Sequence, residues 1–320
     1  MAGNAHPLNK LALAPSATDE CAQSHEDQYV HNIYDQIAPH FSQTRYKPWP
    51  VISKFLESVP TGAIGLDAGT GNGKYLPLSE GRFFTMGVDR SLGLLKFAQY
   101  AGESTIPRDV ILGDVRDLIW RQGIFVSQST GVVFVCLNRQ DFAISIATIH
   151  HLATPERRVD AIMSILSSLS PGGRALIYVW AVEQDELSKR VVPDANEDST
   201  SSTKAQDVLV PWVMQQEQKP KSKKPRRNRK ADHDRGEVQL DSPPPQQSTA
   251  HADSPVFQRY YHLFVSGELT ELATAAATKL NLTVGPVPID TVGGHSQGVY
   301  ISPEGWERSN LYVELTKWSN

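Results

Sequence analysis

The stretch DAGTGNGKY, residues 67–75, directly follows the short apolar run AIGLD of residues 63–67. A short apolar run that ends in a glycine-rich segment predicts a buried strand followed by a tight turn. Gly69, Gly71 and Gly73 allow the backbone to approach a ligand closely at the carboxyl end of that strand, where open α/β sheets bind nucleotides. The loop therefore predicts a ligand site at the end of the first strand of an α/β fold.

Further apolar runs follow this loop, and segments with helical spacing lie between several of them. Strands that alternate with helices predict a mostly parallel sheet buried between two layers of helices. Helical spacing of apolar residues also predicts helices at 29–41 and 267–280. We expect a doubly wound, Rossmann-like α/β fold with seven strands, at residues 63–67, 84–89, 109–114, 141–147, 174–181, 298–301 and 311–315.

Two aspartates end the second and third predicted strands. There Asp89 is placed to accept both ribose hydroxyls of an adenosine, and Asp114 to reach the adenine amine. The spacing D-x-G-x-G-x-G differs from the dinucleotide fingerprint, and Tyr75 stands where a Walker loop has Ser or Thr. Two plainer interpretations stay open: the glycines form only a tight loop, and the aspartates only cap helices.

The composition limits the class of protein. The chain has 320 residues, 40% hydrophobic and 21% charged, with a formal net charge of −4, so nucleic-acid contact depends on local positive charge. Cys21 and Cys136 are its two cysteines, which predicts a reducing compartment, cytosol or nucleus, and no metal site. No apolar run free of loop residues is long enough to cross a bilayer, so we expect no membrane association.

The chain divides into four parts by composition. We expect a flexible tail at 1–27, the core of the fold at 28–185, a disordered basic insert at 186–254, and completion of the same fold at 255–320. The insert has too few apolar residues to offset the entropy of ordering it. Within it, DVLVPWV of residues 207–213 is apolar enough to dock on the folded part.

A more specific resemblance rests on segments outside the glycine loop. Together with the loop they resemble class I S-adenosylmethionine-dependent methyltransferases, and more narrowly the eukaryotic tRNA carboxymethyluridine methyltransferases of the wobble position. The first segment is the most specific, because generic methyltransferases share the loop but not HFSQTRYKPW. The segments are YVHNIYDQIAPHFSQTRYKPWP (29–50), DFAISIATIHHLATPERR (141–158), ALIYVWAVEQ (175–184), VPWV (210–213), RYYHLF (259–264) and GEL (267–269).

The resemblance implies a reaction and a cofactor. The methyl group of S-adenosylmethionine would be transferred to the carboxylate of 5-carboxymethyluridine in tRNA, giving the methyl ester. A carboxylate with a pKa of about 4 is already ionised at neutral pH, so the enzyme has to position it rather than deprotonate it. The expected cofactor-binding residues are Asp67, Gly69, Gly71, Gly73, Asp89, Asp114 and Val115.

The substrate side is expected around RYKPW and the paired histidines. A guanidinium at Arg45 suits a substrate carboxylate or an anticodon phosphate, and the following side chains suit bases and phosphate. The alternative is a surface turn packed on the core by its aromatics. His150 and His151 follow the fourth strand, and we expect them at the methyl acceptor, with a structural role as the alternative. The expected residues are catalytic Arg45, His150 and His151, with Arg45, Tyr46, Lys47 and Trp49 binding substrate.

The densest positive charge is KPKSKKPRRNRK, residues 219–230. A flexible basic arm adds salt-dependent affinity for phosphates, which suits tRNA, and a nuclear-localisation signal explains the same residues. By contrast, Arg157 and Arg158 are either phosphate contacts or solvated helix charges, and we favour the second interpretation. The arm's expected tRNA-binding residues are Lys223, Lys224, Arg226 and Arg227.

Family members work with a small zinc-binding activator protein, so the resemblance implies this partner. We expect it to dock along the exposed edge of strand 109–114.

Residues 118–140 form an insert relative to the family, rich in β-branched and aromatic residues. We interpret it as translated intron sequence or an error in the gene model. Two other functions stay open: a small-molecule methyltransferase of the same fold, and a non-catalytic cofactor-binding scaffold.

Overall fold

The computed structural model describes residues 11–45, 47–117, 140–186, 188, 190–195, 204–214, 255–288 and 296–320. The chain forms two compact units, Met1–Trp212 with Phe257–Asn320, and Val213–Val256. The second unit is described only at its two ends. No helix in the described ranges is long and apolar enough to cross a membrane. The architecture below belongs to the first unit.

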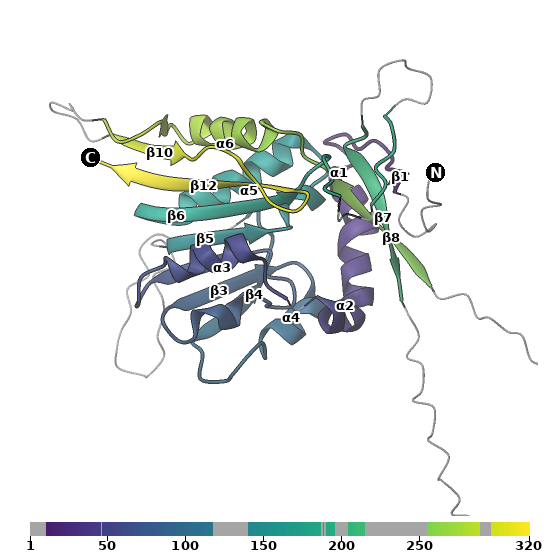
Figure 1. The fold of residues 1–320 in the computed structure, drawn as a ribbon, viewed down its shortest axis with the longest axis horizontal. Coiled ribbons are helices and arrows are strands. Elements are labelled where there is room, and N and C mark those ends of the chain that lie inside the picture. The colour runs from purple at the N-terminus through teal and green to yellow at the C-terminus, as the bar shows by residue number, and fades with distance from the viewer. Residues whose placement is uncertain are drawn as a thin grey trace, which may run out of the picture. The chain divides into compact units, whose positions relative to one another are not determined.

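A central sheet organises the first unit (Figure 1). Five neighbouring strands run parallel, and β12 lies antiparallel to both β6 and β10. The seven longer strands confirm the predicted doubly wound sheet. The order is β4 (Arg108–Leu112), β3 (Phe84–Asp89), β2 (Ile64–Ala68), β5 (Gln140–Ile146), β6 (Leu169–Trp180), β12 (Asn310–Ser319), β10 (Gln297–Ile301) and β9 (Thr283–Val284), with β11 (Gly305–Trp306) paired to β12.

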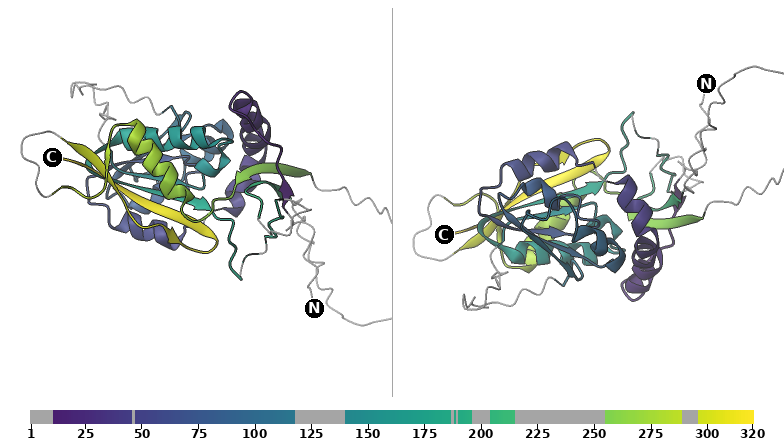
Figure 2. Two further views of the ribbon diagram at one scale, coloured as in Figure 1. Left: turned by 90° about the horizontal axis from the view of Figure 1, so that it is seen from above. Right: turned by 90° about the horizontal axis from the view of Figure 1, so that it is seen from below.

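Helices cover both faces of the sheet (Figure 2). Alternation along β6 explains the two layers, because Leu176 and Tyr178 join the core under α3 (Pro50–Glu57), while Ile177 joins the core under α5 (Pro155–Ser168) and α6 (Glu268–Lys279). The predicted C-terminal helix is thereby confirmed. The remaining helical segments around the sheet are η3 (Leu76–Ser79), α4 (Leu92–Ala98) and η5 (Ile149–His151).

A small second sheet and an N-terminal helix stand where the parallel strands end (Figure 1). The sheet has the order β1 (Ala12–Leu13), β7 (Asp207–Val213), β8 (Val256–His262). Val208, Val210 and Trp212 of β7 are buried, so the predicted docking of residues 207–213 is confirmed. We call this sheet the cap sheet.

The N-terminal helical segment begins earlier than the sequence pattern indicates. Ala22–Glu26 forms α1, Asp27–His31 forms the π-helix η2, and Asn32–Thr44 forms α2, so part of the expected tail is helical. An ion pair holds this start in place: Glu26 is 1% exposed, and the Arg157 Nη2 atom lies 2.6 Å from its Oε2 atom.

The interpretation of Arg157 and Arg158 as solvated charges is therefore wrong. Arg157 is bound to Glu26, and its Nε donates to Glu26 Oε1 at 2.6 Å. Arg158 is buried and donates to the Leu152 carbonyl at 2.8 Å. Helical spacing alone gave no sign that α1 covers this surface.

Close packing between β2 and β5 gives a test of the sheet. A Cβ at Gly65 would lie 2.0 Å from the Phe142 ring. We expect Gly65→Ala to lower the free energy of unfolding by about 1–3 kcal/mol, because the core is overpacked. Urea denaturation measures the loss. In a Phe142→Leu background the loss should be smaller, and an equal loss in both backgrounds would contradict the predicted contact.

Candidate active site

A cavity of about 210 Å³ lies at the carboxyl ends of the parallel strands. Its lining has two groups, which we call the strand-end set and the aromatic set. The strand-end set follows β2, β3 and β4 and includes Gly69, Thr70, Gly71, Asp89, Arg90, Ser91, Gly113, Asp114 and Val115. The aromatic set comes from the N-terminal helices, the cap sheet and the segments after α2, β5 and β6, and includes Tyr34, Phe41, Arg45, Trp49, His151, Trp180, Arg259 and Tyr261.

Hydrogen bonds to β3 bend the glycine-rich loop back over the sheet. The Gly69 N–H donates to the Val88 carbonyl at 2.8 Å, and the Gly71 N–H donates to Asp89 Oδ2 at 2.8 Å. Gly69 has a φ of +89°, and a Cβ there would lie 2.1 Å from Thr148 Oγ1. Both its conformation and the space around it exclude a side chain at Gly69.

Asp67 lies beneath the loop rather than in the cavity lining. Thr70 Oγ1 donates to its Oδ2 atom at 2.8 Å, while its Oδ1 atom is buried with no partner among the described residues. Burial raises the pKa of Asp67 to about 7. The carboxyl group thus holds the loop through Thr70 and keeps one acceptor unused.

Asp89 lines the cavity at the end of β3. Its Oδ1 atom accepts the Ser91 N–H at 2.8 Å, and its Oδ2 atom accepts the N–H of Gly71. Burial raises the pKa of Asp89, although these N–H groups oppose the shift. Each carboxylate oxygen has two acceptor positions, so capacity remains for hydroxyl groups of a ligand.

Asp114 lines the cavity after β4 and is paired with two arginines. The Arg116 Nη2 atom lies 2.7 Å and the Arg90 Nη1 atom 3.0 Å from its Oδ2 atom. Burial acts to raise the pKa of Asp114, but the hydrogen bonds and charge of Arg116 outweigh it, and the pKa lies below its usual value. The carboxylate is therefore ionised and fixed at this strand end.

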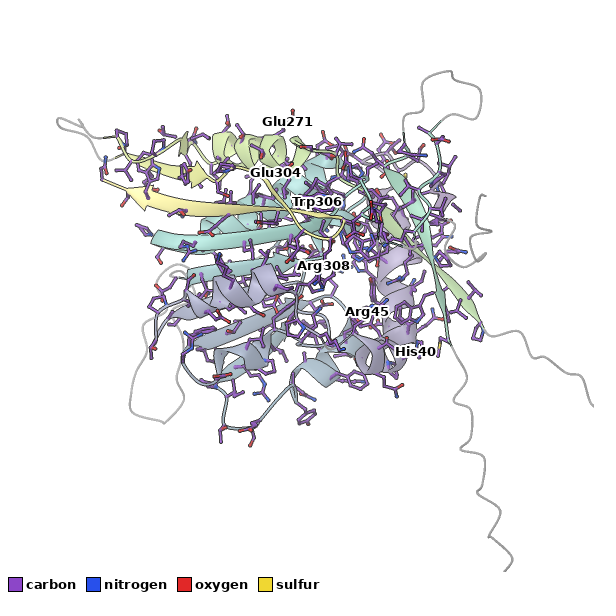
Figure 3. The ribbon with its side chains drawn as sticks, viewed as in Figure 1. His40, Arg45, Glu271, Glu304, Trp306 and Arg308 are labelled. Carbon is purple, nitrogen blue, oxygen red and sulfur yellow. The ribbon has the colours of Figure 1, made fainter. Side chains whose placement is uncertain are left out.

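Arg45 connects the glycine-rich loop with the cap sheet. It follows the last residue of α2, near His40 (Figure 3). Its backbone carbonyl accepts Asn72 Nδ2 at 3.3 Å, and its Cζ atom lies 5.2 Å from the ring centroid of Trp212 on β7. The guanidinium is thereby held beside the loop without an ion pair to any carboxylate that the structure describes.

A hydrogen-bonded chain runs through the aromatic set. His151 Nδ1 lies 2.8 Å from the Tyr260 carbonyl, so this nitrogen carries the proton, and Nε2 accepts the Tyr34 hydroxyl at 3.0 Å. The Tyr34 oxygen in turn accepts from Tyr261 at 3.1 Å and from Arg259 Nη1 at 3.2 Å. Burial lowers the pKa of His151 to about 3, so the ring is neutral.

Comparison with known proteins agrees with this arrangement. No protein-family model matches the chain. The tRNA (carboxymethyluridine(34)-5-O)-methyltransferase of Schizosaccharomyces pombe is 35% identical over 92% of this chain and 98% of its own length. The chain belongs to this methyltransferase family. The enzyme of the same name from Saccharomyces cerevisiae is 43% identical over 63% of each chain.

A solved structure shows the same fold. The 1,6-didemethyltoxoflavin-N1-methyltransferase of Burkholderia thailandensis, with bound S-adenosylhomocysteine, superposes with a TM-score of 0.50 and 15% identity over 96% of this chain and 95% of that one. The class I methyltransferase fold predicted from the sequence is thus confirmed.

Of the twelve predicted site residues that the structure describes, eight line the cavity. Gly73 differs, since a Cβ there would meet Ala98 of α4 rather than the cavity. Lys47 is exposed and outside the lining, and Tyr46 lies outside the described residues, as do the predicted arm residues Lys223, Lys224, Arg226 and Arg227 and the insert residues 118–139. The predicted residues in the lining are Arg45, Trp49, Gly69, Gly71, Asp89, Asp114, Val115 and His151.

His150 does not reach the cavity. It is fully buried, and its Nδ1 atom accepts the Trp180 N–H at 3.2 Å. Burial lowers its pKa well below the usual value, so the ring is neutral. Its position supports a role in holding the end of β6 and gives no support to a catalytic one.

Several lining residues were not predicted from the sequence, and Tyr34, Arg259 and Tyr261 are the ones that the argument below uses. Each lies within a segment that carries the family resemblance. Tyr34 belongs to the apolar stripe that predicts the helix at 29–41, and the pattern of 259–264 gives neither Arg259 nor Tyr261 a place at the site. The available signal was an arginine inside the aromatic strand RYYHLF, where a charged side chain requires a partner or a ligand.

The raised pKa of Asp67 predicts a pH dependence of stability. A carboxyl group whose folded-state pKa is raised from 3.8 to about 7 contributes stability at low pH that is lost as the pH rises through this window. We therefore expect the wild-type protein to lose free energy of unfolding relative to Asp67→Asn between these values. Urea denaturation across the window measures this, and a constant difference between the two proteins would contradict it.

Proposed function

We propose that this protein transfers the methyl group of S-adenosylmethionine to the carboxylate of 5-carboxymethyluridine at position 34 of tRNA, forming the methyl ester. The observation that carries the proposal is the placement of Arg45. Its backbone is bonded to the glycine-rich loop, and its guanidinium lies against the Trp212 ring without a carboxylate partner among the described residues. Positive charge beside a methyl-donor loop suits an anionic methyl acceptor.

The strand-end set fits the cofactor. Asp89 has acceptor capacity for ribose hydroxyls, Asp114 offers oxygens near an adenine amine, and buried Val115 adds an apolar surface. Asp67 supports this set from beneath the loop through its hydrogen bond with Thr70. When bound, S-adenosylmethionine supplies an electrophilic methyl group. Asp89 and Asp114 would orient its adenosyl part.

The methyl transfer requires that the acceptor carboxylate be oriented, and it requires no general base. A carboxylate oxygen bonds to the methyl carbon, the sulfur–methyl bond breaks, and its electron pair stays on sulfur, so no proton moves. A carboxylic acid is already ionised at neutral pH. This agrees with the neutral His151, whose Nε2 lone pair is occupied by the Tyr34 hydroxyl. The aromatic set holds the acceptor in line and excludes water.

Two partners complete the proposal. The basic segment 219–230 suits the tRNA backbone through salt-dependent contacts. The small zinc-binding activator subunit suits the edge strand β4, which ends the sheet order. Leu112 on that strand is 57% exposed, and exposed Leu92, Phe97 and Tyr100 lie on and just after the neighbouring α4. An exposed strand edge with apolar side chains is a site for β-augmentation or helix packing.

The proposed reaction is tested with labelled S-adenosylmethionine and tRNA from cells that lack this gene. We expect a base-labile methyl ester at position 34, formed faster when the activator is present. Label at another position, or none despite cofactor binding, would contradict the proposed acceptor.

Leu112→Asp should remove the response of methyl transfer to the activator, because a charge buried at the interface opposes docking. Leu13→Asp, at an exposed leucine of the cap sheet, serves as the matched control.

A further inference from the structure

Arg259 is a buried cation without a counter-ion. It lies on β8, is 4% exposed, and lines the cavity. Its Nη1 atom donates to the Tyr34 hydroxyl at 3.2 Å, while its Nε atom is buried with no hydrogen-bond partner. It forms no ion pair with a carboxylate in the part of the chain that the structure describes.

Other cations surround Arg259 instead of anions. Burial lowers the pKa of Arg190. Tyr261 and Asp185 oppose this shift, and the charges of Arg45 and Arg259 add to it, so the three guanidiniums lie within electrostatic reach of one another. Arg45 and Arg259 both lie against Trp212, with Cζ atoms 5.2 Å and 4.7 Å from its ring centroid. Like charges gathered in a buried place destabilise the protein unless an anion joins them.

The aromatic rings compensate only part of this charge. Arg259 lies 5.2 Å from the Tyr261 centroid and 5.7 Å from the Tyr34 centroid, and Arg190 lies 3.7 Å from the Trp180 centroid. Rings stabilise a cation from their faces but accept no hydrogen bond in the plane of the guanidinium. The Nε donor of Arg259 is therefore left unsatisfied within the described residues, and an anion in the cavity would offer it an acceptor.

We propose that Arg259 binds the carboxylate of the carboxymethyl group, and so makes the enzyme specific for the acid over uncharged uridines. This inference rests on the proposed function and adds a residue to it. A forked guanidinium grips a carboxylate and fixes the plane of the group, which sets the direction in which the other oxygen faces the methyl donor. Arg45, on the exposed segment after α2, adds positive charge to the same cavity from its solvent side.

The burial of Arg259 favours the carboxylate over a backbone phosphate as the anion. A phosphodiester is flanked by two sugars, whereas a carboxymethyl group is a short arm that reaches into a cavity of about 210 Å³. The buried fork therefore suits the arm of the modified base.

His151 is a positioning residue in this arrangement. Its proton on Nδ1 is held by the Tyr260 carbonyl, its Nε2 atom orients the Tyr34 hydroxyl, and that oxygen accepts from Arg259. The histidine thereby acts on the substrate through two other side chains.

Binding to three anticodon stem-loops tests the inference. The RNAs are identical except that position 34 carries 5-carboxymethyluridine, 5-carbamoylmethyluridine or uridine. The wild-type protein, with S-adenosylhomocysteine and the activator present, should bind the acid about 10- to 100-fold more tightly than the other two, the range for a hydrogen bond to a charged group. Arg259→Gln should bind all three equally. Arg259→Lys should keep an intermediate preference, because it retains the charge without the fork.

The outcomes separate the two proposals. If Arg259→Gln weakens the binding of all three RNAs by the same factor and the preference for the acid remains, Arg259 binds phosphate and the inference fails. If wild-type protein shows no preference for the acid, the inference fails without any variant. If wild-type protein prefers the acid but transfers no methyl group to it, the proposed function fails instead. Unchanged binding of S-adenosylhomocysteine shows that the variants fold. The control variant is Arg174→Gln, because Arg174 is paired with Glu314 and lies outside the cavity lining.

Discussion

The hydroxyl group of Tyr34 joins three parts of the chain that are distant in sequence. It is hydrogen-bonded to His151, which follows β5, and to Arg259 and Tyr261 on the cap sheet. These partners lie 117, 225 and 227 residues from Tyr34 in the sequence, in that order. The N-terminal helix, the central sheet and the cap sheet meet at this oxygen. The aromatic set of the cavity therefore exists only when all three are assembled around it.

Different parts of the fold supply the two sides of the cavity. The parallel strands supply the carboxylates and the glycine-rich loop through their ends, which is a property of the fold. The cap sheet and the segments in and after α2 supply arginines and aromatic rings to the other side of the cavity. A buried, neutral His151 and unpaired guanidiniums belong to an enzyme that orients an existing anion, because a general base would need a pKa near the working pH.

The sequence predicted the parts that local pattern determines. The strands, the loop at Gly69 and the aspartates at two strand ends follow from short apolar runs and from the chemistry of glycine. Arg259 was not predicted as a site residue because its place in the cavity depends on contacts with Tyr34 and Trp212, which lie far away in the chain. Arg157 was misinterpreted for the same reason, since its partner Glu26 is 131 residues away. Pairings of this kind depend on tertiary contacts that periodicity does not encode.

The central claim is that Tyr34 organises the acceptor side of the cavity and leaves the cofactor side alone. Tyr34→Phe tests it, because the change removes one hydroxyl and keeps the ring. We expect cofactor affinity within about twofold of wild type and methyl transfer to tRNA reduced about 10-fold or more, the effect of losing hydrogen bonds that involve a charged group. Unchanged transfer, or an equal loss of cofactor affinity, would show that Tyr34 does not organise the acceptor side.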